Sequence, residues 1–282
     1  MATMFKGIIG GNEFLTEVLV RGLTVNGPAD AYCVGHCTEQ LGSRLYSRCK
    51  VRYVRNITDI VPNSAVLFFT FDTEEANTLL PKIASKIQPW TLVISLVRGL
   101  KLATLEHFFP NNEIVRLAIN PSVISGAGLG AYAVSKNASA DARSMAHIVL
   151  KECGDVIAVD NEDELEKIGN YLTANTYFAY LIIRSMMKSA KQLGMDSKET
   201  NFAVSKLLQG ATHTLIDEGY DTADVISRGL NDEHVAGIAG HLVKSFGITD
   251  DVIQSIEKFE PHPKEKSPDD PENYKIHYRW SR

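Results

Sequence analysis

The amino-acid sequence predicts an α/β domain built on a parallel sheet, followed by an all-helical domain. Up to about residue 160, short apolar runs alternate with segments of helical periodicity. Near-continuous apolar strands separated by helices are typical of a parallel sheet that is covered on both faces. Beyond that point long helical patterns take over and no convincing strand remains. A chain of 282 residues is long enough for two domains of moderate size.

Strand and helix segments alternate regularly through the first half. They cover, in order, residues 4–9, 13–25, 29–34, 38–47, 51–54, 65–71, 72–87, 91–96, 102–108, 114–118, 130–135, 138–151 and 156–159. Segment 72–87 illustrates why a helix is expected. It opens with Asp72, Thr73 and Glu74, and capping or anionic side chains suit the unpaired N–H groups at the start of a helix.

The second half opens with the acidic run N-E-D-E at 161–164, which is typical of a helix start. A long helix is expected over 166–194, about 40 Å at 1.5 Å per residue, and a second over 196–218. Gly194 and Gly219 suit their C-terminal ends. Shorter helices are expected over 222–226, 232–246 and 250–259.

These patterns predict three regions: residues 1–160 as the α/β domain, 161–259 as the helical domain, and 260–282 as a charged, proline-rich tail. A long helix at the start of the second domain would bury its apolar face poorly alone. Pairing with a second copy of the chain covers such a face, so a homodimer is expected, with a higher oligomer as the alternative.

Composition narrows the class of protein. The chain is 44% hydrophobic and 22% charged, with a net charge of −5, so it has no electrostatic footprint for nucleic acid. No pair of its four cysteines has C-x-x-C spacing, and no metal site is predicted. The chain contains no apolar run of membrane-spanning length, and its N-terminal apolar run is too short for a signal peptide. We therefore expect a soluble cytoplasmic protein with reduced cysteines and no membrane partner.

Residues 7–15, G-I-I-G-G-N-E-F-L, have the character of a phosphate-binding loop. A dinucleotide site needs a tight turn after the first strand and a helix whose N-terminus points at the pyrophosphate. Gly10 and Gly11 suit the turn, and Asn12 is a short residue that tolerates left-handed backbone angles. The G-x-G-x-x-G fingerprint is not met, because Asn12 and Leu15 occupy its second and third glycine positions.

The end of the second strand bears on the choice of dinucleotide. NAD sites place an acidic residue there to bind the ribose hydroxyls. Here Asp30 comes too early and Glu39 too late, whereas His36, Thr38 and Arg44 would suit a 2′-phosphate. The sequence therefore favours NADP as the cofactor, with NAD as the alternative.

Further motifs follow in a characteristic order. Residues 91–100 are T-L-V-I-S-L-V-R-G-L, 102–106 are L-A-T-L-E, 114–121 are I-V-R-L-A-I-N-P and 126–128 are G-A-G. In the helical half, 190–195 are A-K-Q-L-G-M, followed by Q-G-A at 209–211 and E-G at 218–219. In this order and spacing, the chain resembles the pyrroline-5-carboxylate reductase family over about residues 5–259.

The resemblance implies a fold and an activity. The fold is an N-terminal Rossmann-type dinucleotide-binding domain followed by a helical dimerisation domain of the 6-phosphogluconate dehydrogenase C-terminal type. The family transfers hydride from NAD(P)H to the C=N bond of a small five-membered ring and forms proline. The cofactor contacts expected from this resemblance are Gly10, Gly11, Asn12, Glu13, Phe14, His36, Thr70, Phe71, Val97 and Asn120.

The substrate motifs depart from the family pattern. The family's S-G-S-x-P-A-Y falls on residues 172–178, L-T-A-N-T-Y-F, and its S-P-G-G-T-T falls around 227–234, S-R-G-L-N-D-E-H. The glycines and hydroxyls that would cradle a substrate carboxylate are largely replaced by other polar groups. The expected substrate-binding residues are Asn120, Thr173, Asn175 and Asn231.

The catalytic candidates are His234 and Thr176. A histidine titrates near neutral pH and is suited to donate a proton; the alternative for His234 is a helix-capping or surface role. These groups favour an altered substrate, an imine that lacks the carboxylate or is differently substituted, or another small ligand.

Two other classes of protein are alternatives for this sequence. The related β-hydroxyacid dehydrogenases need a lysine followed four residues later by asparagine on the long helix. Lys167 is followed by Tyr171 at that spacing, which disfavours this class. The other alternative is a non-catalytic dimeric nucleotide-binding or scaffold protein that kept the fold, and the altered glycine loop and substrate motifs favour it over an ordinary proline-pathway enzyme.

Overall fold

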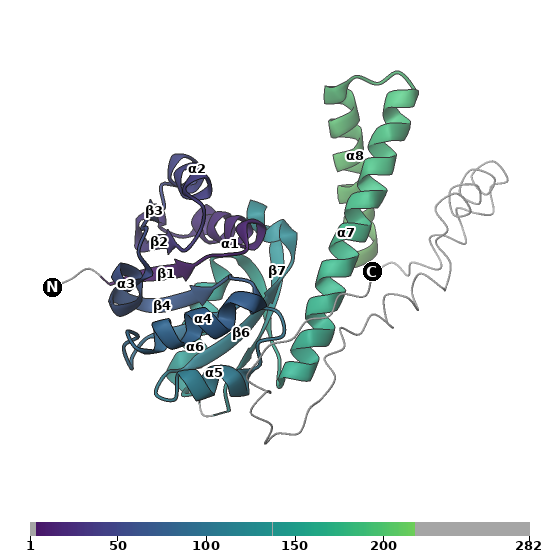
Figure 1. Ribbon diagram of the computed structural model, residues 1–282. Helices are drawn as coiled ribbons and strands as arrows, with labels where there is room; N and C mark the ends of the chain where they lie inside the picture. The colour runs from purple at the N-terminus through teal and green to yellow at the C-terminus, as the bar shows by residue number, and fades with distance from the viewer. Residues whose placement is uncertain (1–3, 137, 218–282) are drawn as a thin grey trace. The chain divides into compact units, whose positions relative to one another are not determined.

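The computed structural model describes residues 4–136 and 138–217. This part of the chain divides after Thr173 into two compact units. The first unit is a sheet of eight strands in the order β3-β2-β1-β4-β5-β6-β7-β8, flanked by helices (Figure 1). The strands are β1 Phe5–Ile9, β2 Tyr32–Gly35, β3 Arg52–Tyr53, β4 Ser64–Phe69, β5 Leu92–Ser95, β6 Ile114–Ile119, β7 Gly128–Val134 and β8 Gly154–Ala158.

Helices connect these strands. They are α1 Glu13–Asn26, α2 Glu39–Cys49, α3 Ile57–Ile60, α4 Thr73–Ala84, α5 Leu102–Phe108 and α6 Ala140–Lys151, with 3₁₀ turns η1 Ala29–Ala31, η2 Val61–Asn63 and η3 Pro121–Ser125. The alternation predicted from the sequence is therefore confirmed. Residues 29–31, predicted as the start of a strand, form the 3₁₀ turn η1 instead. Helix α3 was not predicted because its four residues are too few to show a helical period.

Both faces of the sheet are covered. Neighbouring residues on one strand join different core clusters: Ile8 packs into one and Ile9 into the other, and the same alternation holds for Phe68 and Phe69 on β4. Successive side chains on a strand point to opposite faces. Consecutive apolar residues occur on these strands because each face carries its own core, as expected for a doubly covered sheet.

One expectation about the sheet is wrong at its far edge. The first six strands in the sheet order, β3-β2-β1-β4-β5-β6, run parallel. Strand β7 pairs antiparallel with β6, and β8 runs parallel to β7. The reason is the length of the connection. A parallel return needs a crossover of a dozen or more residues, whereas β6 and β7 are joined by the single turn η3 and by Gly126, whose φ is +75°.

Arg116 connects the sheet to the next helix. Its side chain is 7% exposed on β6, and it donates to Glu162 Oε1 at 2.8 Å and to Glu166 Oε1 at 2.7 Å. Glu162 Oε1 also accepts from the N–H of Leu102 at 2.8 Å, at the start of α5. The acidic run predicted as a helix start therefore begins α7, Glu162–Gln192, and anchors it to β6 and α5.

The described part of the second unit is a helical hairpin. Figure 1 shows α7 and α8, Ser197–Thr212, as an antiparallel pair, followed by the π-helical turn His213–Asp217. Gly194, with φ +88°, ends α7, and the capping pair of Asp196 and Glu199 begins α8. None of the described helices combines the length and apolarity that crossing a bilayer requires. The shorter helices and tail predicted beyond 217 lie outside the described residues.

Candidate functional site

The glycine loop, residues 10–12, lies where the ends of three neighbouring strands meet. Gly10 N–H donates to Gly35 O at the end of β2 at 2.8 Å. Asn12 N–H donates to Thr70 O, just beyond β4, at 3.0 Å. The loop is thus held by backbone hydrogen bonds at the carboxyl edge of the sheet, where ligands bind in open α/β folds.

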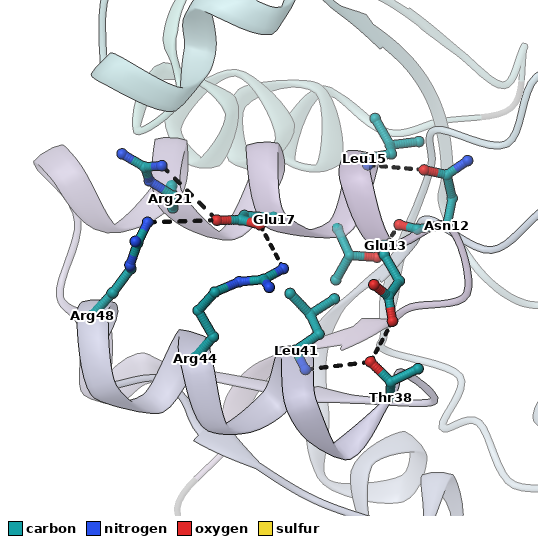
Figure 2. A network of polar contacts seen from close by, with 10 residues as sticks. Asn12, Glu13, Leu15, Glu17, Arg21, Thr38, Leu41, Arg44 and Arg48 are labelled. Atoms are coloured by element: carbon teal, nitrogen blue, oxygen red, sulfur yellow. Dashed lines mark hydrogen bonds and ion pairs between the residues drawn. The ribbon is translucent and has the colours of Figure 1, made fainter.

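Asn12 begins helix α1 as its N-cap. Its Oδ1 accepts from Leu15 N–H at 2.9 Å, and its backbone is extended, with φ −77° (Figure 2). A side-chain oxygen at this position satisfies one of the N–H groups that a helix start leaves unpaired. The asparagine at the second glycine position of the fingerprint therefore serves as a cap and does not adopt the left-handed conformation.

The two glycines are required by close packing. A Cβ on Gly10 would lie 3.0 Å from His36 O, tighter than ordinary contact. Gly11 has φ +144°, and a Cβ there would lie 2.7 Å from Phe71 Cα and would overlap Glu75 Oε2. The second overlap places a carboxylate directly against the loop.

Two buried threonines, Thr16 and Thr70, hold the loop through hydrogen bonds. Thr16 Oγ1 on α1 lies 2.8 Å from Thr70 Oγ1 and donates to Asn12 O at 2.7 Å. Thr70 and the neighbouring Phe71 are fully buried. The side chains of these two predicted cofactor contacts therefore support the loop, so a contact with cofactor would come from their backbone.

Carboxylates from the first turn of α4 face the loop. Asp72 Oδ1 accepts from Asn12 Nδ2 at 2.9 Å. Glu75 Oε2 accepts from Asp72 N–H at 3.3 Å, and Glu75 Oε1 lies 2.9 Å from His36 Nε2. Asp72 was predicted as a helix start, but Glu75 was missed. The available signal was the D-x-x-E spacing at 72–75, which is typical of a capping box.

The groups suited to a 2′-phosphate already have anionic partners. His36 is paired with Glu75, and its backbone is left-handed with φ +52°. Thr38 Oγ1 donates to the carboxylate of Glu13.

Arg44 of α2 lies between the two helices. Its Nη2 donates to Glu17 Oε2 of α1 at 2.8 Å, and Arg21 and Arg48 approach the same carboxylate at 3.9 Å (Figure 2). Glu17 therefore binds the arginines between α1 and α2, away from the loop itself.

The remaining predicted cofactor contacts are dispersed. Phe14 is 59% exposed on the first turn of α1, and Val97 is buried after β5. Asn120 follows β6, where its Oδ1 accepts from Leu129 N–H at 3.0 Å and its N–H donates to Leu129 O at 3.1 Å. These bonds hold the start of β7 beside the end of β6.

The predicted substrate residues lie partly outside the described chain. Thr173, Asn175 and Thr176 are half-buried within one turn of α7, and Thr173 Oγ1 donates to Gly169 O at 2.9 Å. Asn231 and His234 lie outside the described residues. The proposed substrate and catalytic roles of all five stay predictions.

The thiol nearest the loop, Cys37, is protonated at neutral pH because its pKa is raised. Burial, together with the charge of Glu13, raises the pKa of Cys37 to about 11. Burial also raises the pKa of Cys33 and of Cys153 to about 12. All four cysteines are free. The thiolate is the reactive form, so the raised pKa values make Cys33, Cys37 and Cys153 poorly suited to act as nucleophiles at neutral pH.

The backbone of the site fits a dinucleotide, but one side chain conflicts with it. A helix N-terminus and two glycines lie at the carboxyl edge of adjacent strands, the arrangement that binds a pyrophosphate. The conflicting side chain is Glu75, whose carboxylate lies over Gly11. Glu75 also contacts His36, and because β1 lies between β2 and β4 this pair spans the end of β1. In this arrangement the Glu75 carboxylate occupies the space over Gly11 that a pyrophosphate would approach.

The chain matches no protein-family model. It is similar in sequence to pyrroline-5-carboxylate reductase 2 of Bacillus subtilis, at 23% identity over 217 residues that cover 76% of this chain and 77% of that protein. It is also 23% identical to pyrroline-5-carboxylate reductase of Synechocystis over 253 residues, or 89% of each chain.

Solved structures share the fold. Plasmodium falciparum pyrroline carboxylate reductase with NADP bound superposes with a TM-score of 0.77 at 14% identity, covering 91% of this chain and 95% of that one. The Streptococcus pyogenes 1-pyrroline-5-carboxylate reductase gives 0.74 at 15% identity, covering 92% and 97%. The predicted resemblance and the predicted fold class are both confirmed.

Proposed function

We propose that this divergent relative of the pyrroline-5-carboxylate reductases is an oxidoreductase that uses a nicotinamide dinucleotide to reduce the C=N bond of a small cyclic imine. The observation that carries the proposal is the glycine loop. Backbone hydrogen bonds hold it to Gly35 O and Thr70 O at the carboxyl edge of the sheet, ahead of a capped helix. A dinucleotide would bind there. NADP is the proposed cofactor and NAD the alternative.

The substrate proposal rests on the polar groups of α7 and of the following segments. Thr173, Asn175 and Thr176 are uncharged hydroxyl and amide groups, and we assign substrate contacts to them and to Asn120 and Asn231. His234 and Thr176 are the proposed catalytic residues, with His234 as the proton donor. Uncharged groups of this kind suit an imine that lacks a carboxylate.

The proposed assembly is a homodimer through the helical region, residues 161–259, with 1–160 as the dinucleotide-binding domain. Several large apolar side chains on the hairpin support it because they are exposed in the single chain. They are Tyr177, Tyr180, Leu181, Phe202 and Leu207. Large apolar side chains exposed on one helical hairpin are suited to an interaction surface. Light scattering in solution measures the mass directly.

The substrate prediction is tested by oxidation of NADPH and NADH with two kinds of imine. We expect a cyclic imine without a carboxylate to be reduced faster than pyrroline-5-carboxylate, because the residues replacing the family's carboxylate cradle are not suited to an anion. The absorbance of the reduced cofactor reports the rate. Each imine without the protein is the control. Strong turnover of pyrroline-5-carboxylate would contradict the altered-substrate prediction and leave the reductase proposal standing.

A second candidate function is a non-catalytic nucleotide-binding or scaffold protein. The contact between His36 and Glu75 favours it, because the pair places a carboxylate against Gly11 in the glycine loop. The same assay separates the two functions. A dimer that binds dinucleotide without oxidising it in the presence of any imine supports a binding protein, and a dimer with no dinucleotide affinity supports a scaffold.

A further inference from the structure

We propose that Glu75 is a gate on the dinucleotide crevice, which must leave the glycine loop before a dinucleotide can bind and which keeps the affinity of the wild-type chain low. The proposal rests on the proposed function, since it concerns the same crevice. It makes Glu75 a determinant of dinucleotide affinity, because its carboxylate opposes every ligand whose phosphates have to cross the loop.

The position of Glu75 follows from the order of the strands. β1 lies between β2 and β4 in the sheet. A dinucleotide in this fold lies along the carboxyl edge and passes over the loop that follows β1. His36 follows β2 and Glu75 lies beyond β4, and their side chains meet with Nε2 and Oε1 2.9 Å apart. The pair therefore spans the path that a bound dinucleotide would take.

The carboxylate also fills the space that Gly11 keeps open. Glycine at such a position lets phosphate approach the backbone closely. Here a Cβ on Gly11 would overlap Glu75 Oε2, so this oxygen already lies against the glycine. A phosphate and a carboxylate cannot share this space, and their like charges repel.

Few contacts hold the Glu75 side chain against the glycine loop. Glu75 accepts one hydrogen bond from Asp72 N–H at 3.3 Å and makes one contact with His36, and its side chain is 39% exposed. Rotation of the side chain would move the carboxylate into water without disturbing the core. The neighbouring acids Asp72 and Glu13 are engaged by Asn12 and Thr38 and add negative charge to the same rim.

The experiment measures the dissociation constants for NADPH and NADH by isothermal titration calorimetry on the full chain. Glu75→Ala clears the space over Gly11, whereas Glu75→Gln keeps the length and an acceptor for Asp72 N–H and removes only the charge. Glu74→Gln is the matched control. It removes the same charge from the same helical turn, but Glu74 is exposed. Circular dichroism and thermal melting confirm that each variant is folded.

We expect Glu75→Ala to bind both dinucleotides about tenfold more tightly than wild type or better, with Glu75→Gln between them. Glu74→Gln should stay within about twofold of wild type, because its carboxylate does not contact the loop. A gain for NADPH and NADH alike is expected, since the pyrophosphate is common to both.

The outcomes separate the gate from the proposed function. Equal, measurable affinity in wild type and both Glu75 variants overturns the gate and leaves the dinucleotide function standing. A gain in Glu74→Gln equal to that in Glu75→Ala also overturns it, since the effect would then be one of general charge. If folded wild type and every variant fail to bind, both proposals fall. If Glu75→Ala binds tightly and no imine is reduced, the gate stands and the reductase proposal falls.

Discussion

At the residue scale, Gly11 and His36 show how much of this site depends on backbone geometry. Gly11 has φ +144° with Phe71 Cα directly beside it, and His36 takes the left-handed conformation at φ +52° without being glycine. Non-glycine residues adopt positive φ rarely, and such strain is concentrated at functional sites. Both residues border the crevice and both contact Glu75, so the strained backbone and the gate form one local arrangement.

Substituting Gly11 tests this geometry. We expect Gly11→Ala to lower the free energy of unfolding by about 1–3 kcal/mol, because a Cβ meets Phe71 and the positive φ is strained for alanine. Urea denaturation measures the change. Gly210→Ala on α8 is the control, since a Cβ there meets nothing within 4 Å. It should be neutral or stabilising by about 0.5–1 kcal/mol. Equal stability of Gly11→Ala and wild type would show that the loop tolerates a side chain.

The raised thiol pKa values predict slow alkylation. Burial raises the pKa of Cys37 from 9.0 to about 11, so at pH 8 its thiolate fraction is about 100-fold lower than that of an unperturbed cysteine. Iodoacetamide should therefore label Cys37 slowly at pH 8, and the rate should rise about tenfold per pH unit to beyond pH 9. Mass spectrometry of the digested protein follows each cysteine. The unfolded chain in urea is the control, and rapid labelling of native Cys37 would contradict the raised pKa.

At the element scale, a polar cluster joins segments distant in the sequence. Lys6 of β1 bonds to Glu152, just after α6, and to Tyr32 Oη of β2 at 3.1 Å. Tyr32 Oη also donates to Glu152, and burial, with the contact to Glu152, raises the pKa of Tyr32. The side chains of Lys6 and Glu152 are 19% exposed. The pair thus connects the first strands to the helix that precedes β8.

Breaking this pair should weaken the first unit. We expect Glu152→Gln to lower the free energy of unfolding by about 2 kcal/mol, between the values typical of exposed and of buried pairs, because Lys6 loses its charged partner. Asp155→Asn is the matched control. Its ion pair with Lys151 lies on the surface, with Asp155 80% exposed, and its loss should leave the unfolding midpoint unchanged. A wild-type midpoint in Glu152→Gln would assign the pair no role in stability.

At the scale of the whole molecule, local patterns predicted the order of elements well. Helix α5 has the predicted bounds, 102–108, and α1 extends one residue beyond its predicted end. Gly10 and Gly11 predicted the position of the loop from the sequence alone. The prediction of strand direction failed at β7, where the length of the connection decides the direction. β7 was expected to run parallel, and the short turn η3 leaves it antiparallel.

By itself, the sequence determined the alternating α/β half, the helical half and the place of the loop. Periodicity, glycines and capping residues act within a few positions along the chain, so they are visible without a structure. Only the tertiary structure decided that Glu75 lies over Gly11 and meets His36. Glu75 is 64 positions from Gly11 and 39 positions from His36 in the chain. They meet because β1 lies between β2 and β4 in the sheet. A contact of that kind depends on the packing of whole elements, for which local sequence carries no signal.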